Sequence, residues 1–271
     1  MPEHSPTALL PIGVFDSGIG GLTVVRALRA RLPQEHILYF GDTARVPYGV
    51  KSPETIAQFA TQITEFLLEQ RVKLLIVACN TMAAVASHGI RALSPVPVLD
   101  VLEAGAQAAV GATRSRRVGV IGTLATVTSR AYEQAIRDRD GAIETHAQAC
   151  PLFVPLIEEG WLDHPVTRLT AQEYLAPLLQ RRIDTLVLGC THYPLLAPLI
   201  REIAGPEVCM VDSAETVAEQ AAARLAEGGI ENRDPGPATL RFFVTDVPQR
   251  FREVGERFLG AGFAHVHVVK W

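Results

Sequence analysis

The sequence has 271 residues, of which 48% are hydrophobic and 20% charged, a balance typical of a globular protein with one large or two modest domains. With 25 Lys and Arg against 29 Asp and Glu, the net charge of −4 favours neither nucleic acid nor an anionic membrane as a partner. No apolar run approaches the roughly 18 residues that span a bilayer, and residues 1–11 lack the pattern of a leader, so we expect a cytoplasmic protein.

Short apolar runs alternate with helical patterns along the chain. The runs predict strands at residues 12–15, 37–40, 74–78, 118–121, 186–188 and 208–211. Stretches between them, such as 55–69 and 170–179, place apolar residues three and four apart, as in helices that cover a sheet. The alternation predicts an α/β fold with mostly parallel sheets flanked by helices, and a site at the strands' carboxyl ends.

The chain also repeats itself. Residues 13–17 (GVFDS) are echoed by 119–123 (GVIGT), and residues 75–81 (LIVACNT) by 186–192 (LVLGCTH), at offsets of 106 and 111 residues. Because the two offsets nearly agree, we predict two similar lobes.

The last part of the sequence is too short to form a domain of its own. A Gly- and Pro-rich loop at 228–237 precedes a predicted strand at 240–245, a helix and a strand at 265–269. We expect this tail to pack on the first lobe. The first lobe is then discontinuous, comprising residues 1–97 and 211–271, with 98–210 as the second lobe.

Two of the four cysteines stand in matched positions. Cys79 and Cys190 each end an apolar strand, and polar pairs follow them, Asn80-Thr81 and Thr191-His192. A single cysteine in such a strand is most often buried packing, but two in matched contexts indicate a shared role. No CxxC pair is present, and Cys-x-His lacks a fourth ligand, so we expect free thiols and neither a disulfide framework nor a metal.

A thiol needs a neighbour to act as a base at neutral pH. His192 is the obvious neighbour of Cys190. Asp16 is the candidate for Cys79, although an Asp at a strand-to-helix turn is more often a cap. The glycine turn at 18–21 does not fit a nucleotide-binding motif, but its N–H groups are suited to a substrate carboxylate.

The loop at 41–49 supplies two further candidates. Tyr48 is a possible hydrogen-bond donor in a pocket. Arg45 is suited either to clamping a carboxylate or to a solvated loop position.

Taken together, these motifs resemble the glutamate racemases of the aspartate/glutamate racemase superfamily over nearly the whole chain. The resemblance rests on GVFDSGIGGLT at 13–23, GDT at 41–43 with PYG at 47–49, ACNT at 78–81, and LGCTHYPLL at 188–196. It implies two lobes related by pseudo-twofold symmetry, an active site in the cleft between them, and no pyridoxal phosphate, metal or other cofactor.

The resemblance also implies residue roles. Cys79 and Cys190 would be the two bases, acting on D- and L-glutamate respectively, with Asp16 and His192 assisting them. Glu158, which adjoins Glu159, would lie near the substrate ammonium. The glutamate site would comprise Asp16, Ser17, Tyr48, Gly49, Asn80, Thr81, Glu158, Thr191 and His192.

The implied function is interconversion of L- and D-glutamate by two-base proton transfer, which supplies D-glutamate for peptidoglycan and hence for the cell wall and cell shape. We expect a homodimer. Three alternatives remain: a racemase of aspartate or a related acid, a cysteine amidohydrolase that uses Cys190 and His192 while Cys79 is structural, and a non-catalytic amino-acid-binding protein.

Overall fold

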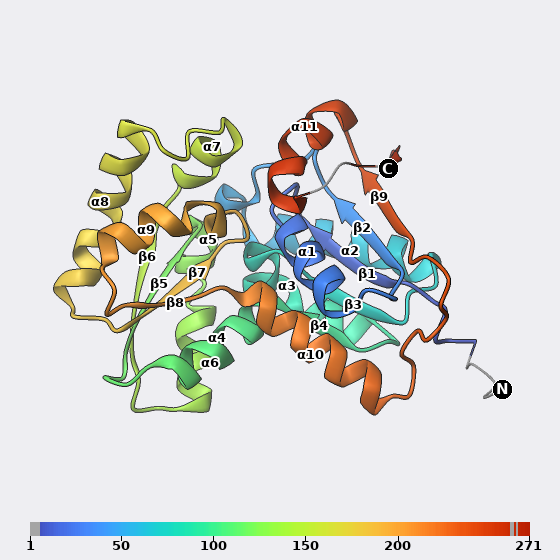
Figure 1. Ribbon diagram of the computed structural model, residues 1–271, viewed down its shortest axis with the longest axis horizontal. Helices are drawn as coiled ribbons and strands as arrows, with labels where there is room; N and C mark the ends of the chain where they lie inside the picture. The colour runs from blue at the N-terminus through green and yellow to red at the C-terminus, as the bar shows by residue number, and fades with distance from the viewer. Residues whose placement is uncertain (1–5, 261–262, 264) are drawn as a thin grey trace.

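The computed structural model describes residues 6–260, 263 and 265–271. Within these residues, six strands form a sheet in the order β10-β9-β2-β1-β3-β4, and four form a second sheet in the order β6-β5-β7-β8 (Figure 1). All paired strands are parallel, as predicted for an α/β fold.

The strands are β1 (Ile12–Asp16), β2 (Ile37–Gly41), β3 (Leu74–Val77), β4 (Val98–Asp100), β5 (Arg117–Gly122), β6 (Glu144–Ala149), β7 (Thr185–Gly189), β8 (Cys209–Val211), β9 (Leu240–Val244) and β10 (Val266–Val268). The helices are α1 (Leu22–Arg31), α2 (Pro53–Glu69), α3 (Asn80–Leu93), α4 (Val101–Ala112), α5 (Leu124–Thr128), α6 (Ala131–Arg139), α7 (Phe153–Glu158), α8 (Pro165–Gln180), α9 (Ala197–Ala204), α10 (Ser213–Glu227) and α11 (Pro248–Leu259). Short 3₁₀ turns lie at Tyr48–Val50 and Tyr193–Leu196.

Strand β1 shows how the apolar runs place helices on both faces of a sheet. Ile12 and Val14 belong to an apolar cluster with residues of α1 and α10, whereas Phe15 belongs to a second cluster with residues of α2 and α3. Successive side chains of a strand point to opposite faces, so an uninterrupted apolar run is buried on both. In the second sheet, α8 and α9 lie on one side and α4 and α6 on the other (Figure 1).

The two sheets share one topology. The order β2-β1-β3-β4 recurs as β6-β5-β7-β8, and the echoed sequence segments fall on β1 and β5 and on β3 and β7. The C-terminal tail extends the first sheet, as expected, because β9 pairs with β2 and β10 with β9. The repeat therefore reflects two halves with the same strand order.

Two edge strands were not predicted. Strand β4 pairs with β3, so the first sheet continues to Asp100, beyond the boundary expected at residue 97. Strand β6 (ETHAQA) lies at the edge of the second sheet with mostly half-buried residues, which is why it lacks an apolar run. Residues 1–5, 261–262 and 264 of the expected first lobe lie outside the described residues.

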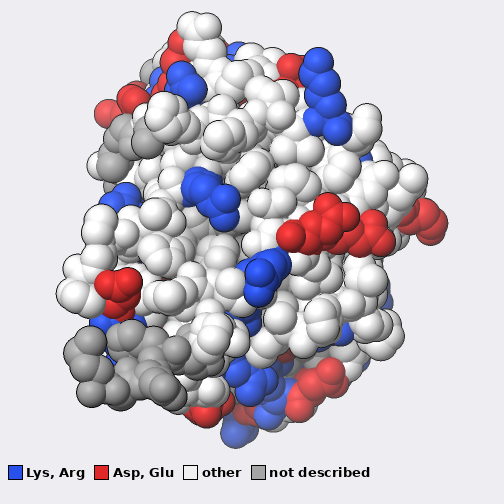
Figure 2. Space-filling view, turned by 90° about the vertical axis from the view of Figure 1, so that its right-hand side faces the viewer, with Lys and Arg blue, Asp and Glu red and all other residues white. Residues whose placement is uncertain are grey.

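Within the described part of the chain, no helix is long and apolar enough to cross a membrane. On the face shown in Figure 2, acidic and basic side chains are interspersed rather than gathered by sign.

Candidate active site

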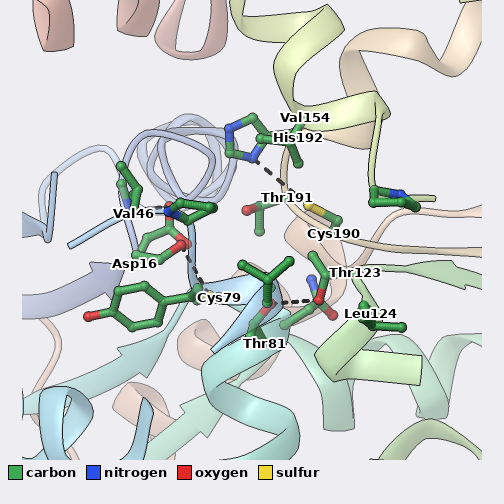
Figure 3. Close-up of a pocket in the computed structure, with 18 of the residues that line it drawn as sticks. Asp16, Val46, Cys79, Thr81, Thr123, Leu124, Val154, Cys190, Thr191 and His192 are labelled. Atoms are coloured by element: carbon green, nitrogen blue, oxygen red, sulfur yellow. Dashed lines mark hydrogen bonds between the residues drawn. The ribbon is translucent and has the colours of Figure 1, made fainter. Parts of the chain in front are cut away.

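A cavity of about 350 Å³ opens where the carboxyl ends of strands from both sheets meet. Asp16 ends β1, Cys79 follows β3, Thr123 follows β5 and Cys190 follows β7, and all four line it (Figure 3). The cavity brings together every residue that the resemblance implies for the site: Asp16, Ser17, Tyr48, Gly49, Cys79, Asn80, Thr81, Glu158, Cys190, Thr191 and His192.

Cys79 is buried at the N-cap position of α3. Its thiol donates to Oγ of Ser17 at 3.5 Å. Burial, together with the negative charge of Asp16, raises the pKa of the Cys79 thiol to about 12, and the backbone N–H of Met82 in the first turn of α3 partly opposes this. Cys79 is therefore a thiol at neutral pH, suited to donating a proton.

Cys190 has a different neighbourhood. Its Sγ lies 3.9 Å from Nδ1 of His192, and Nε2 of the same ring lies 3.0 Å from Oε1 of Glu158 (Figure 3 shows the first contact). Burial alone would lower the pKa of His192, but the hydrogen bonds to Cys190 and Glu158 outweigh burial and raise this pKa to about 10. The ring of His192 is thus placed to exchange a proton with the Cys190 sulfur.

The structure distinguishes Glu158 from its neighbour Glu159. Burial acts to raise the pKa of Glu158, but the hydrogen bond to His192 and its charge outweigh burial and lower this pKa below its ordinary value. Glu159 instead pairs with Arg250 at 3.1 Å and is exposed. Glu158 therefore holds a negative charge against His192.

Asp16 caps the glycine turn, and its assistance to Cys79 stays a prediction. Its Oδ2 accepts hydrogen bonds from the backbone N–H groups of Gly18 at 3.2 Å and Gly21 at 3.1 Å, so it caps the glycine turn. Burial nevertheless raises the pKa of Asp16, although the charge of His192 and these N–H groups act against it. The expectation that this turn offers its N–H groups to a carboxylate is wrong for these two groups, because Asp16 already uses them.

The glycine turn contacts the segment that carries the second cysteine. A Cβ at Gly20 would lie 2.4 Å from both Nδ1 of His192 and Oγ1 of Thr191. The hydroxyl of Thr23 also donates to the carbonyl of Thr191 at 3.3 Å. Glycine is thus required at position 20 so that the two halves can approach.

The loop after β2 differs in detail from expectation. The ring of Tyr48 lines the cavity. Its hydroxyl, however, donates to Oδ2 of Asp42, which does not line the cavity. Arg45 pairs with the same carboxylate at 2.6 Å and lies over the ring of Phe59. Arg45 does not line the cavity and is not placed to clamp a carboxylate in it.

Thr123 is a lining residue that sequence reasoning did not assign. Its Oγ1 lies 2.9 Å from Oγ1 of Thr81, which joins the two halves across the cavity (Figure 3). The signal was the echo of residues 13–17 by 119–123, which places Thr123 where the first half has Ser17.

All four cysteines are free, as expected. Among the described residues, no group of three or more His, Cys, Asp or Glu side chains is arranged to hold a metal ion.

This chain is similar in sequence and in fold to several known racemases. The chain is 62% identical over 270 residues to the glutamate racemase of Syntrophus aciditrophicus, covering 100% of each chain, and 57% identical over 260 residues to that of Neisseria meningitidis serogroup A, covering 96% of each. The structure of glutamate racemase from Francisella tularensis in complex with D-glutamate superposes with a TM-score of 0.92 at 42% identity, covering 97% of this chain and 98% of that one. Since the sequence profile described as Asp/Glu/Hydantoin racemase also matches residues 22–221, the chain belongs to the Asp/Glu/hydantoin racemase family.

Proposed function

We propose that this protein is a glutamate racemase that moves protons with two opposed cysteines and no cofactor. The observation that carries the proposal is the pair of buried thiols, Cys79 and Cys190, which follow equivalent strands of the two sheets and line one cavity. Glutamate is chosen as the substrate because the relatives of highest identity named above are glutamate racemases, one of them in complex with D-glutamate.

Racemisation removes the α-proton on one face and returns a proton on the other. In the free protein, Cys79 keeps its proton because its pKa is raised to about 12, and His192 lies beside Cys190 as its partner for proton transfer. Cys190 then abstracts the α-proton of one enantiomer, L-glutamate by family resemblance, as Cys79 protonates the opposite face. The reverse reaction starts from the opposite protonation pattern.

The carbanion needs stabilisation by the protein. Ser17, Asn80, Thr81 and Thr191 line the cavity and supply hydroxyl and amide donors for the substrate carboxylates, and Tyr48 and Gly49 form part of the same wall. Donors that are already oriented stabilise developing charge without reorganisation, and each is worth several kcal/mol, about 2.7–4 in measured cases. Glu158 acts through His192, and its expected contact with the substrate ammonium stays a prediction.

We also propose that each sheet is the core of one lobe, with boundaries near residues 100 and 212, and that lobe closure excludes water. The D-glutamate formed would supply peptidoglycan synthesis, which rescue of a D-glutamate auxotroph by this chain tests. The homodimer and the cytoplasmic location stay predictions.

The test is incubation with L-glutamate in heavy water without added cofactor. Two opposed bases predict that early product D-glutamate carries deuterium at the α-carbon while unreacted L-glutamate does not. Cys79→Ser and Cys190→Ser are each expected to lower kcat by about 10²–10⁴-fold. Cys209→Ser is the matched control, because Cys209 is exposed and outside the cavity.

Near-normal racemisation by Cys79→Ser would refute the two-base scheme. Faster turnover of L-aspartate would refute the substrate assignment. Binding of glutamate without exchange of its α-proton would indicate a non-catalytic binding protein.

A further inference from the structure

Tyr132 of α6 connects the two halves next to the first cysteine. Its side chain is buried, and its hydroxyl donates a 2.6 Å hydrogen bond to Oδ1 of Asn80. Asn80 opens α3 directly after Cys79 and lies 52 residues earlier in the chain. The hydrogen bond therefore joins a helix beside the second sheet to the segment that carries Cys79.

The ring of Tyr132 also reaches the segment of the second cysteine. A Cβ at Gly189 would lie 3.1 Å from Cε2 of this ring, and a Cβ at Gly105 would lie 2.8 Å from its hydroxyl oxygen. Glycine at these two positions lets the ring pack against the backbone. Because Gly189 directly precedes Cys190, one side chain touches the residue after Cys79 and the residue before Cys190.

The side-chain amide nitrogen of Asn80 is not used by the contact with Tyr132. Among the described residues, its Nδ2 is buried without a hydrogen-bond partner, and the residue lines the cavity. Leaving a buried amide without a partner is unfavourable, so a partner is expected when ligand binds. The Tyr132 hydroxyl occupies Oδ1, which leaves the two N–H donors of Nδ2 for an acceptor such as a carboxylate oxygen.

We propose that Tyr132 is a positioning residue for racemisation, which orients the Asn80 amide so that Nδ2 donates to a carboxylate oxygen of the substrate. The inference rests on the proposed function, which supplies that carboxylate. Tyr132 does not line the cavity and acts only through Asn80. The donated hydrogen bond strengthens as negative charge moves onto the carboxylate in the carbanion.

The test is a double-mutant cycle with L-glutamate. Tyr132→Phe keeps the ring and removes the hydroxyl, and we expect kcat/KM to fall about tenfold, mainly through kcat, for one lost buried hydrogen bond. In the Asn80→Ala background the same substitution is expected to change kcat/KM by less than about twofold, because its route of action is gone. Tyr174→Phe is the matched control, since its hydroxyl only accepts a 3.4 Å bond from the backbone N–H of Leu152.

A Tyr132→Phe enzyme with wild-type kcat/KM would overturn this inference alone. So would losses that multiply in the double variant, because they indicate a structural role independent of Asn80. A wild-type enzyme that does not racemise glutamate would overturn the proposed function, and this inference with it.

Discussion

Replacing Glu158 with glutamine removes a negative charge 3.0 Å from Nε2 of His192 while keeping the shape of the side chain and an oxygen acceptor. The carboxylate attracts the imidazolium through a full charge and the amide only through a dipole, so the substitution costs the imidazolium about 1.4 kcal/mol. That difference corresponds to about one pKa unit. The pKa of His192 is therefore expected to fall from about 10 to about 9.

The assay is kcat/KM for L-glutamate between pH 7 and 10.5, expressed as the ratio of variant to wild type so that titration of the substrate amino group cancels. Below pH 8 His192 stays protonated in both proteins and the ratio changes little. At pH 9.5 the ratio is expected to be about threefold lower, because more of the variant has lost the proton.

A ratio that is low but independent of pH would refute this reasoning, because Glu158 would then act by shape rather than by charge. Glu159→Gln is the control. Its carboxylate is exposed and pairs with Arg250, so its ratio should stay near one throughout.

Protein stability offers a second readout with a defined sign. Because folding raises the pKa of His192, the charged pair stabilises the fold fully below the unfolded histidine pKa of about 6.5, and this contribution is lost as the pH rises through about 10. Glu158→Gln should therefore lower the free energy of unfolding by about 1.4 kcal/mol at pH 7 and by almost nothing at pH 10.5.

Two further substitutions test the packing around the site. Gly20→Ala places a Cβ 2.4 Å from Nδ1 of His192 and should lower kcat/KM about a hundredfold. Gly89→Ala is the control and should leave kcat/KM unchanged, because a Cβ there has nothing within 4 Å. Equal kinetics of the two variants would contradict the close approach of Gly20 to His192. Lys73→Met leaves Glu35 buried without its partner at 2.6 Å and should lower the free energy of unfolding in urea by about 3–5 kcal/mol. Adding Glu35→Leu should restore much of that loss, and a double variant no more stable than the single one would count against a buried charge as the cause.

Local sequence patterns were sufficient for most of the fold. Strands β1 and β3 could be predicted because their residues are apolar without interruption, and this pattern occurs where a parallel sheet is covered on both faces. Strand β6 was not predicted from the sequence, because a half-buried edge strand does not need an apolar run. Cys79 and Cys190 stood out because each follows such a strand, where the carboxyl end opens toward a site.

Specific side-chain pairings could not be predicted in the same way. Arg45 was suited either to clamping a carboxylate or to a solvated position. In the structure it pairs with Asp42 and lies over the ring of Phe59. Glu158 and Glu159 are adjacent and chemically identical, yet only the first faces His192.

The sequence by itself determined the parallel α/β fold, the repeated halves and the two cysteines, because these depend on residue types at short spacing. Only the tertiary structure decided what each cysteine has beside it. Glu158 reaches His192 across 34 residues, and Tyr132 reaches Asn80 across 52. Such contacts depend on tertiary packing, within the second half for Glu158 and His192 and between the two halves for Tyr132 and Asn80, which no local pattern encodes.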